Sequence, residues 1–256
     1  MNNTSSHLDL IPVLEELLTR SRNLFNQQFV GLYLHGSLAL GDFDPQHSDI
    51  DFLVITREDL PEDAISALEA FHEQLAAGSP RWGSDLEGSY IPLDAIRRHD
   101  PANAVHPHIE RGGILRVEQH HSDWVLQRHI IRERGVVLAG PDPKALIDPV
   151  GPDELREAVL GLLWWWDLPL KDSTLLDQDA YQAYAALTMC RILYTLHHGA
   201  VVSKPVAARW ALAGPAEPWR GLIERAMRHE VDRGTLDETK ELIRFTLDRS
   251  RRLASV

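Results

Sequence analysis

Two aspartates separated by one residue introduce an apolar stretch of the chain. Asp49 and Asp51 flank Ile50, and the run IDFLVI (50–55) is typical of a buried β-strand. Because side chains alternate along a strand, both carboxylates point to one face and Ile50 points to the core. Two carboxylates this close repel one another, and a divalent cation that also takes oxygen ligands from a triphosphate relieves the repulsion. The pair therefore predicts a magnesium site.

A Gly-Ser pair precedes this motif, with eleven residues between them. Gly36 and Ser37 follow the short apolar stretch VGLYLH (30–35), for which we predict a strand, and a Gly-, Asp- and Pro-rich segment up to Ser48 follows, for which we predict a loop. Glycine lets the backbone approach a ligand closely, and free N–H groups with the Ser37 hydroxyl can hold phosphate oxygens. Either motif alone is common in turns. Together they predict a phosphate-binding turn beside the metal site.

A third carboxylate should come from a strand next to the paired aspartates. The segment 84–93 is a predicted strand in which Asp85 and Glu87 share one face. We choose Glu87, because a mid-strand position lets a neighbouring strand fix its side chain. Asp85 lies near the start of the strand, where exposure is more common, and it stays the alternative.

The elements that must position these residues divide near residue 150. The predicted fold class is α+β: a mixed sheet with flanking helices over residues 1–150, and a helical bundle over 151–256. Besides the two strands above and the one over 84–93, strands are predicted over 113–118 and 135–138. Helices of the first half are predicted over 8–29, over 61–76 and around 124–130. Helices of the second half are predicted over 153–167, 178–198, 203–213, 218–231 and 236–253.

Composition narrows the classes of function. The chain has 256 residues with 26 basic and 38 acidic side chains, which gives a formal charge of −12. Binding of duplex nucleic acid needs clustered Lys and Arg, so the balance argues against it and favours a small cationic ligand. No apolar run approaches the ~20 residues that span a bilayer, and the N-terminus has no secretory signal pattern. A single cysteine, Cys190, excludes an internal disulfide, so we expect a cytoplasmic protein without membrane attachment.

The first-half motifs resemble a known signature. The strand, the Gly36-Ser37 turn and Ser-Asp-Ile-Asp (48–51) are similar to the signature of the nucleotidyltransferase superfamily that shares the catalytic core of DNA polymerase beta. In the second half, LTMCRILY (187–194) and GAVVSKPVAARWA (199–211) resemble the helical domain of the streptomycin/spectinomycin adenylyltransferases. VLAGPDP (137–143), running on to IDPV, resembles that family's domain junction.

The resemblance implies a role for each motif residue of the first half. It implies a nucleotidyltransferase domain over residues 1–150, in which Gly36 and Ser37 hold the phosphates of ATP. Asp49 and Asp51 would bind Mg²⁺. Glu87 would complete the metal site and act as the general base on an antibiotic hydroxyl.

The resemblance also implies a helical substrate-binding domain over residues 151–256, whose Arg191 and Lys204 reach the nucleotide phosphates. Lys204 stands at the start of a predicted helix, where a cation opposes the helix dipole, so a bound triphosphate would explain it. The alternatives are a solvated lysine and an ordinary ion pair for Arg191. The family's streptomycin-binding tryptophan and acidic residue have no unambiguous counterpart here, so the acceptor stays open.

The remaining candidates have structural interpretations. The three tryptophans at 164–166 could line a pocket, although such a run in a helix more often covers a domain interface. His35 abuts Gly36 and would support the phosphate turn. The other histidine pairs lack the spacing of a zinc site, and we interpret them as solvated or structural: His106 and His108, His120 and His121, His197 and His198.

The sequence therefore predicts an ATP- and Mg²⁺-dependent adenylyltransferase that acts on a cationic aminoglycoside or aminocyclitol, an antibiotic-resistance activity. One rival is an enzyme of the same fold that modifies a protein or nucleic-acid acceptor. The other is a nucleotide-binding module whose site has decayed, which the intact set of Ser37, Asp49, Asp51 and Glu87 disfavours. The oligomeric state stays open.

Overall fold

The structure is a computed structural model that describes residues 10–79 and 81–254. Its chain forms two compact units, Met1–Pro149 and Val150–Val256. Within the described residues, no helix is both long and apolar enough to cross a membrane. The predicted helix over 8–29 is α2, Ile11–Phe25, followed by a short 3₁₀ turn, and its first two predicted residues lie outside the described ones.

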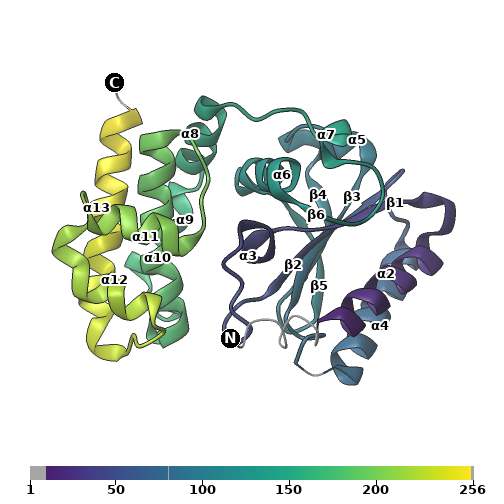
Figure 1. Ribbon diagram of the computed structural model, residues 1–256, viewed down its shortest axis with the longest axis horizontal. Coiled ribbons are helices and arrows are strands. Elements are labelled where there is room, and N and C mark those ends of the chain that lie inside the picture. The colour runs from purple at the N-terminus through teal and green to yellow at the C-terminus, as the bar shows by residue number, and fades with distance from the viewer. Residues whose placement is uncertain (1–9, 80, 255–256) are drawn as a thin grey trace. The chain divides into compact units, whose positions relative to one another are not determined.

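The first unit is built on a mixed six-stranded sheet (Figure 1). The strand order is β5-β4-β3-β2-β1-β6, in which β2 and β3 are parallel and every other neighbouring pair is antiparallel. The predicted α+β class is confirmed. The strands are β1 Phe29–Leu34, β2 Ile50–Thr56, β3 Leu86–Pro92, β4 Val105–Glu110, β5 Ile114–Gln119 and β6 Val136–Ala139.

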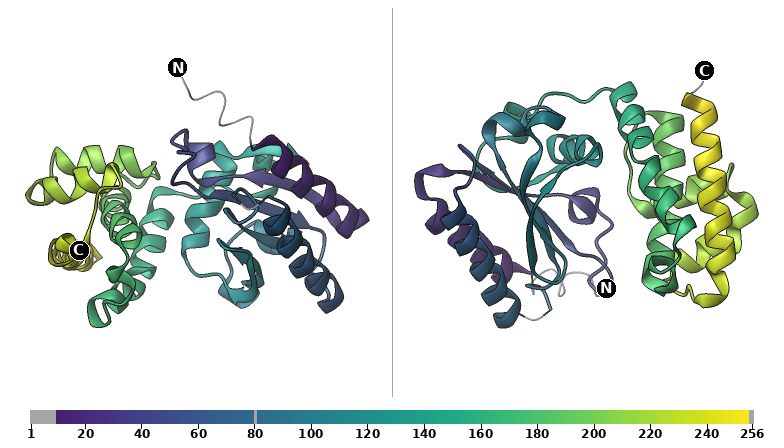
Figure 2. Two further views of the ribbon diagram at one scale, coloured as in Figure 1. Left: turned by 90° about the horizontal axis from the view of Figure 1, so that it is seen from below. Right: turned by 180° about the vertical axis from the view of Figure 1, so that it is seen from behind.

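Alternation along β2 gives the sheet two different faces. Phe52 and its neighbours in alternation, Ile50 and Val54, are fully buried in a core covered by α2 and α4 (Glu62–Gly78). Figures 1 and 2 show these two helices together on one side of the sheet. The other face carries a second core around Leu53, covered by three helices: α5 (Leu93–Ile96), α6 (Asp123–Arg134) and α7 (Pro143–Leu146).

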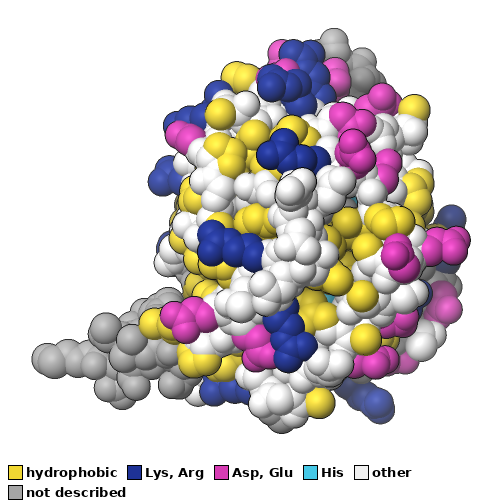
Figure 3. All heavy atoms as spheres, turned by 90° about the vertical axis from the view of Figure 1, so that its right-hand side faces the viewer, with side chains coloured by type: hydrophobic (Ala, Val, Ile, Leu, Met, Phe, Trp, Pro, Cys, Tyr) yellow, Lys and Arg dark blue, Asp and Glu magenta, His cyan; other side chains and the backbone are white. Residues whose placement is uncertain are grey.

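The outer surface on the side of α2 and α4 has a mixed character. In Figure 3, which views the right-hand side of Figure 1, basic and acidic side chains are interspersed with hydrophobic ones. The visible face therefore shows the alternating charges of an ordinary solvated surface.

The second unit is all helical, and its longest helix lies at its centre. Helix α10, Asp179–His198, packs against the other helices of the unit and is buried along most of its length. The predicted bundle is confirmed. Its other helices are α8 Pro152–Gly161, α9 Leu163–Lys171, α11 Lys204–Leu212, α12 Arg220–Met227 and α13 Leu236–Ala254.

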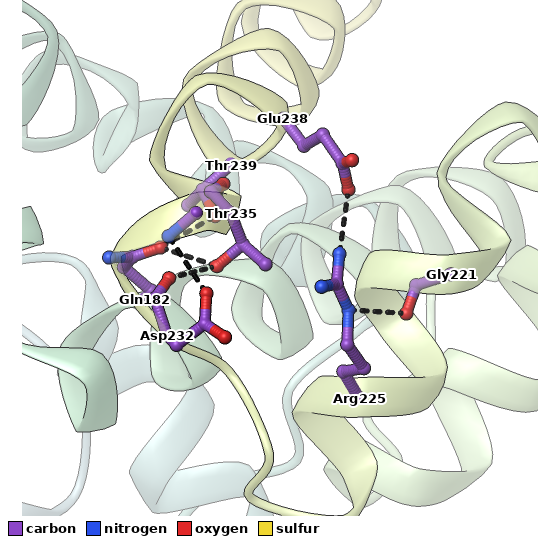
Figure 4. A network of polar contacts seen from close by, with 8 residues as sticks. Gln182, Gly221, Arg225, Asp232, Thr235, Glu238 and Thr239 are labelled. Atoms are coloured by element: carbon purple, nitrogen blue, oxygen red, sulfur yellow. Dashed lines mark hydrogen bonds and ion pairs between the residues drawn. The ribbon is translucent and has the colours of Figure 1, made fainter.

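A buried polar network fastens α10 to α13 (Figure 4). The amide oxygen of Gln182 accepts hydrogen bonds from the hydroxyls of Thr235, at 2.7 Å, and Thr239, at 3.4 Å. Asp232 caps the turn before α13 by accepting from the Gly234 N–H at 2.8 Å. Because Gln182, Thr235 and Thr239 are all fully buried, the network fixes the register of the two helices.

Three local predictions are wrong. The predicted loop after Ser37 begins instead with a short helix, α3, Gly36–Leu40. Strand β4 was missed, because Pro107 lies inside it and proline argues against a central strand. The ladder between β3 and β4 has only two residue pairs and ends at His108, so Pro107 lies just beyond it. The predicted helix over 153–167 is broken at Leu162 into α8 and α9.

Candidate active site

Three carboxylates meet where β2 and β3 begin. In the parallel register Asp51 is paired with Glu87, and Asp49 directly precedes β2. One carboxylate oxygen from each of Asp49, Asp51 and Glu87 lies within 4.8 Å of the other two, and each residue is partly exposed. We call this group the acidic cluster. Its hard oxygen ligands suit a divalent cation such as Mg²⁺.

Gly36 is required beside the acidic cluster for two reasons. Its φ of +55° lies in the left-handed region, and a Cβ added there would overlap the carboxylate of Asp51. The backbone just before it is fixed to the same strand, because the His35 N–H donates to the Asp51 carbonyl at 3.0 Å. A side chain at position 36 would therefore displace the carboxylate that the predicted metal site needs.

Ser37 lies in the first turn of α3, next to Gly36. Its hydroxyl oxygen is buried, and no hydrogen-bond partner for it exists among the described residues. The first N–H groups of a helix also lack partners within the helix. A buried hydroxyl and free N–H donors beside the acidic cluster are the groups that a phosphate would satisfy.

Asp85, the alternative third carboxylate, is directed elsewhere. Its carboxylate accepts hydrogen bonds from Arg111 at 2.7 and 2.8 Å, and it does not belong to the acidic cluster. Its backbone carbonyl accepts from the Ile50 N–H at 2.8 Å, which starts the ladder between β2 and β3. The geometry thus brings Glu87, and not Asp85, to the paired aspartates.

Arg191 and Lys204 both lie in the helical unit. Arg191 is a half-buried residue of α10 for which the described part of the chain offers no ion pair. Lys204 is the first residue of α11, and its ammonium group lies 4.6 Å from the centre of the Tyr184 ring. Their predicted contact with a nucleotide stays a prediction.

A cavity of about 160 Å³ opens beside the acidic cluster, entirely within the first unit. Its floor is the sheet face that carries Asp51 and Glu87, and its wall is the first two turns of α6. No local sequence pattern indicates this cavity, because its lining depends on the pairing of β4 with β5. The remaining lining residues are His35, Gly88, His108, Glu118, Gln119, His120, His121, Asp123, Trp124 and Gln127.

Two of the histidines that were expected to be solvated or structural are buried in the first unit. His106 and His120 are buried, at 1% and 4% exposure. Burial lowers the pKa of His120 to about 2 and is the main cause of the lowered pKa of His106, so both rings are neutral at neutral pH. Ser89 joins the group, with its hydroxyl 2.8 Å from Nδ1 of His108 and 3.3 Å from Nε2 of His120.

His35 also differs from an ordinary surface histidine. Its side chain is 4% exposed, and burial lowers its pKa to about 4. The backbone of Phe52 and the side chain of Gln127 hydrogen-bond to the ring and oppose this shift, but burial outweighs them. The neutral ring is thus a buried part of the lining of the cavity beside the acidic cluster.

The three tryptophans at 164–166 differ in their exposure to solvent. Trp164 and Trp165 are nearly half exposed, whereas Trp166 is buried and stacks with Tyr184 at 5.9 Å between ring centres. Cys190 is fully buried, and burial raises its pKa to about 12, as expected for a residue that fills a core.

Comparison with protein families matches both units. Residues 145–248 match the aminoglycoside adenylyltransferase C-terminal domain, and residues 14–85 match the nucleotidyltransferase domain. The second match contains the Gly-Ser pair and both aspartates of the acidic cluster, and it ends just before Glu87.

Individual proteins give the same result. The chain is 28% identical over 233 residues to an aminoglycoside (3'') (9) adenylyltransferase of Escherichia coli, covering 84% of this chain and 85% of that protein. It is 25% identical over 203 residues to a spectinomycin 9-adenylyltransferase of Staphylococcus aureus, covering 75% and 74%.

A solved structure shares the fold. The spectinomycin adenyltransferase AAD(9) from Enterococcus faecialis, solved with ATP and spectinomycin, superimposes with a TM-score of 0.74 and covers 94% of this chain and 99% of that chain, at 18% identity. The resemblance inferred from the motifs is confirmed. The chain is an aminoglycoside adenylyltransferase-like nucleotidyltransferase.

Proposed function

We propose that this chain transfers AMP from ATP to a hydroxyl group of an aminoglycoside or aminocyclitol and releases pyrophosphate. The observation that carries the proposal is the acidic cluster beside Gly36 and Ser37, in a chain whose relatives are named as adenylyltransferases of such antibiotics. ATP is the nucleotide with which the similar AAD(9) structure was solved.

The residues at the acidic cluster fit a magnesium ion. Three carboxylates supply oxygen ligands within 4.8 Å of one another, and the glycine at position 36 leaves room for one of them. Asp49, Asp51 and Glu87 would hold the metal. When bound, magnesium would neutralise the charge of the triphosphate and orient it for attack at the α-phosphorus.

Glu87 is the proposed general base. Its carboxylate would take the proton of the acceptor hydroxyl, whose oxygen forms a bond to the α-phosphorus of ATP while the bond to pyrophosphate breaks. Glu87 is half-buried and faces Asp51 across the parallel ladder, so the strand pairing holds it beside the metal ligands. The Ser37 hydroxyl and the N–H groups of α3 would bind phosphate oxygens.

Arg191 and Lys204 are proposed to bind the nucleotide phosphates from the helical unit. The absence of an ion pair between Arg191 and any other described residue supports a role toward a ligand, and the position of Lys204 at the start of α11 supports the same. Replacing Lys204 by Ala should weaken ATP binding by about 10-fold, as loss of a charged contact does. Calorimetry with Mg-ATP measures it.

A mass-resolved acceptor screen tests the proposal. The protein is incubated with Mg-ATP and a panel that includes streptomycin, spectinomycin, a protein mixture and RNA. We expect one or more of the antibiotics to gain the mass of AMP with one pyrophosphate released per transfer. A gain of phosphate alone, or AMP appearing only on protein or RNA, would replace the proposal with a kinase or with a macromolecular acceptor.

A further inference from the structure

We propose that the cavity beside Glu87 binds an ammonium group of the acceptor, with the carboxylates of Glu118 and Asp123 as its anionic partners. The proposal rests on the proposed function for the identity of the molecule that carries the ammonium group. It concerns side chains of the first unit alone.

The two carboxylates reach the cavity from different elements. Glu118 belongs to β5 and is paired in register with His106 of β4, whereas Asp123 is the first residue of α6. Both are partly buried, and both line the same small cavity as Glu87. An acceptor whose cationic group lies between Glu118 and Asp123 would thus have its neighbouring atoms close to the proposed base.

The cavity offers several hydrogen-bond acceptors and two carboxylates besides the acidic cluster. Besides the carboxylates, neutral histidine rings line it, and each neutral ring has one nitrogen that accepts. The His35 ring is 4% exposed and is kept neutral by burial, so it adds no positive charge to the cavity. A primary ammonium carries three donors and no acceptor, so it complements this lining, whereas a phosphate does not.

Partial burial of Asp123 also favours binding of a cation in the cavity. Burial raises the pKa of Asp123 against the smaller opposing effects of its own backbone hydrogen bonds and nearby cations. Of the two side chains that oppose this shift by their charge, His121 has the larger effect, and the buried Arg128 already donates to the backbone carbonyls of Ala95 and Ile96. A partly desolvated carboxylate that faces a cavity is stabilised when a cation enters it.

The test uses 2-deoxystreptamine, a small aminocyclitol with two ammonium groups, and its neutral di-N-acetyl derivative. Binding to the full chain in EDTA is followed by the NMR signal of the Trp124 indole N–H, assigned with Trp124→Phe. Glu118→Gln and Asp123→Asn keep shape and remove charge. Glu110→Gln, on the same hairpin, and Glu133→Gln, on the same helix, are matched controls outside the cavity.

We expect saturable binding of the dication, a loss of about 10- to 100-fold in affinity for each cavity variant, and wild-type affinity for both controls. The neutral derivative should bind far more weakly. Melting curves check that all variants fold. Wild-type affinity in Glu118→Gln and Asp123→Asn, or no binding to the wild-type protein, would overturn the ammonium site.

The acceptor screen separates this outcome from the proposed function. Binding that depends on Glu118 and Asp123 without any AMP transfer would keep the ammonium site and overturn the enzyme assignment. AMP transfer to an antibiotic, with unchanged affinity for 2-deoxystreptamine in both variants, would keep the enzyme assignment and overturn the ammonium site.

Discussion

The two faces of β2 and β3 differ in what their side chains do. On the face covered by α2 and α4, Phe52 packs against Tyr90 and His72 with ring centres 5.7 and 6.0 Å apart, and all three side chains are buried. On the opposite face, the same strands present Asp51 and Glu87 to the acidic cluster and to the cavity.

The difference shows how one pair of strands can serve both stability and chemistry. Successive side chains point to opposite faces, so each strand carries a packing residue directly next to a reactive one. Packing on the one face stabilises the fold. This stabilisation offsets the repulsion among the three carboxylates on the other face, which is not relieved without a cation. Changes on the two faces should therefore separate activity from stability.

The largest effect is expected at the acidic cluster. Asp49→Asn removes one metal ligand, so transfer should fall to background. Because the change also relieves repulsion between carboxylates, the melting temperature in EDTA should stay the same or rise. Turnover assays and melting curves measure both, and near-normal turnover would exclude Asp49 from the site.

The next largest effect distinguishes the roles of Glu87, in β3, and Asp85, which directly precedes β3. Glu87→Gln keeps size but cannot accept the hydroxyl proton, so turnover should fall by about 10²–10⁴-fold with little change in Mg-ATP affinity. Asp85→Asn loses only the contact with Arg111 and should be nearly silent in turnover. The reverse result, measured in the same assay, would move the base to Asp85.

A smaller effect comes from His72, whose ring is buried on the packed face. Burial lowers the pKa of His72 to about 3, below its ordinary value of 6.5. The unfolded chain then binds the proton more tightly, so this contribution to stability is complete above pH 6.5 and is lost as pH falls toward 3. The slope is about 1.4 kcal/mol per pH unit.

Denaturant unfolding between pH 7 and 4 measures this slope. His72→Gln removes the titrating ring, so the slope should decrease. Tyr90→Phe is the matched control, because it removes the hydroxyl that lies 2.7 Å from Nε2 of His72 but leaves the ring. Equal slopes in His72→Gln and the wild type would show that His72 is not the group that titrates.

The acidic cluster could be predicted because its information is local. Alternation along two short segments placed Asp49, Asp51 and Glu87 on one face, and a strand next to β2 was enough to join them. The preference for Glu87 over Asp85 followed from its position in the strand. The helix at Gly36 was missed, because a glycine followed by a Gly-, Asp- and Pro-rich segment is also typical of a loop.

The cavity could not be predicted, because it depends on contacts between distant segments. Glu118 and Asp123 line it because β4 pairs with both β3 and β5. Strand β4 was not predicted, because Pro107 lies within it and proline is uncommon inside strands. Likewise, the apolar run through the tryptophans at 164–166 gave no local sign of the break at Leu162.

The most direct test compares two adjacent residues of β2, Asp51 and Phe52, by measuring turnover and the free energy of unfolding for Asp51→Asn and Phe52→Ala. We predict that Asp51→Asn loses transfer and keeps its free energy of unfolding within about 0.5 kcal/mol. Phe52→Ala should lose about 3–5 kcal/mol and keep most of the wild-type kcat while it is folded. Near-normal turnover in Asp51→Asn, or a loss of stability as large as that of Phe52→Ala, would contradict the separation of chemistry and packing on the two faces.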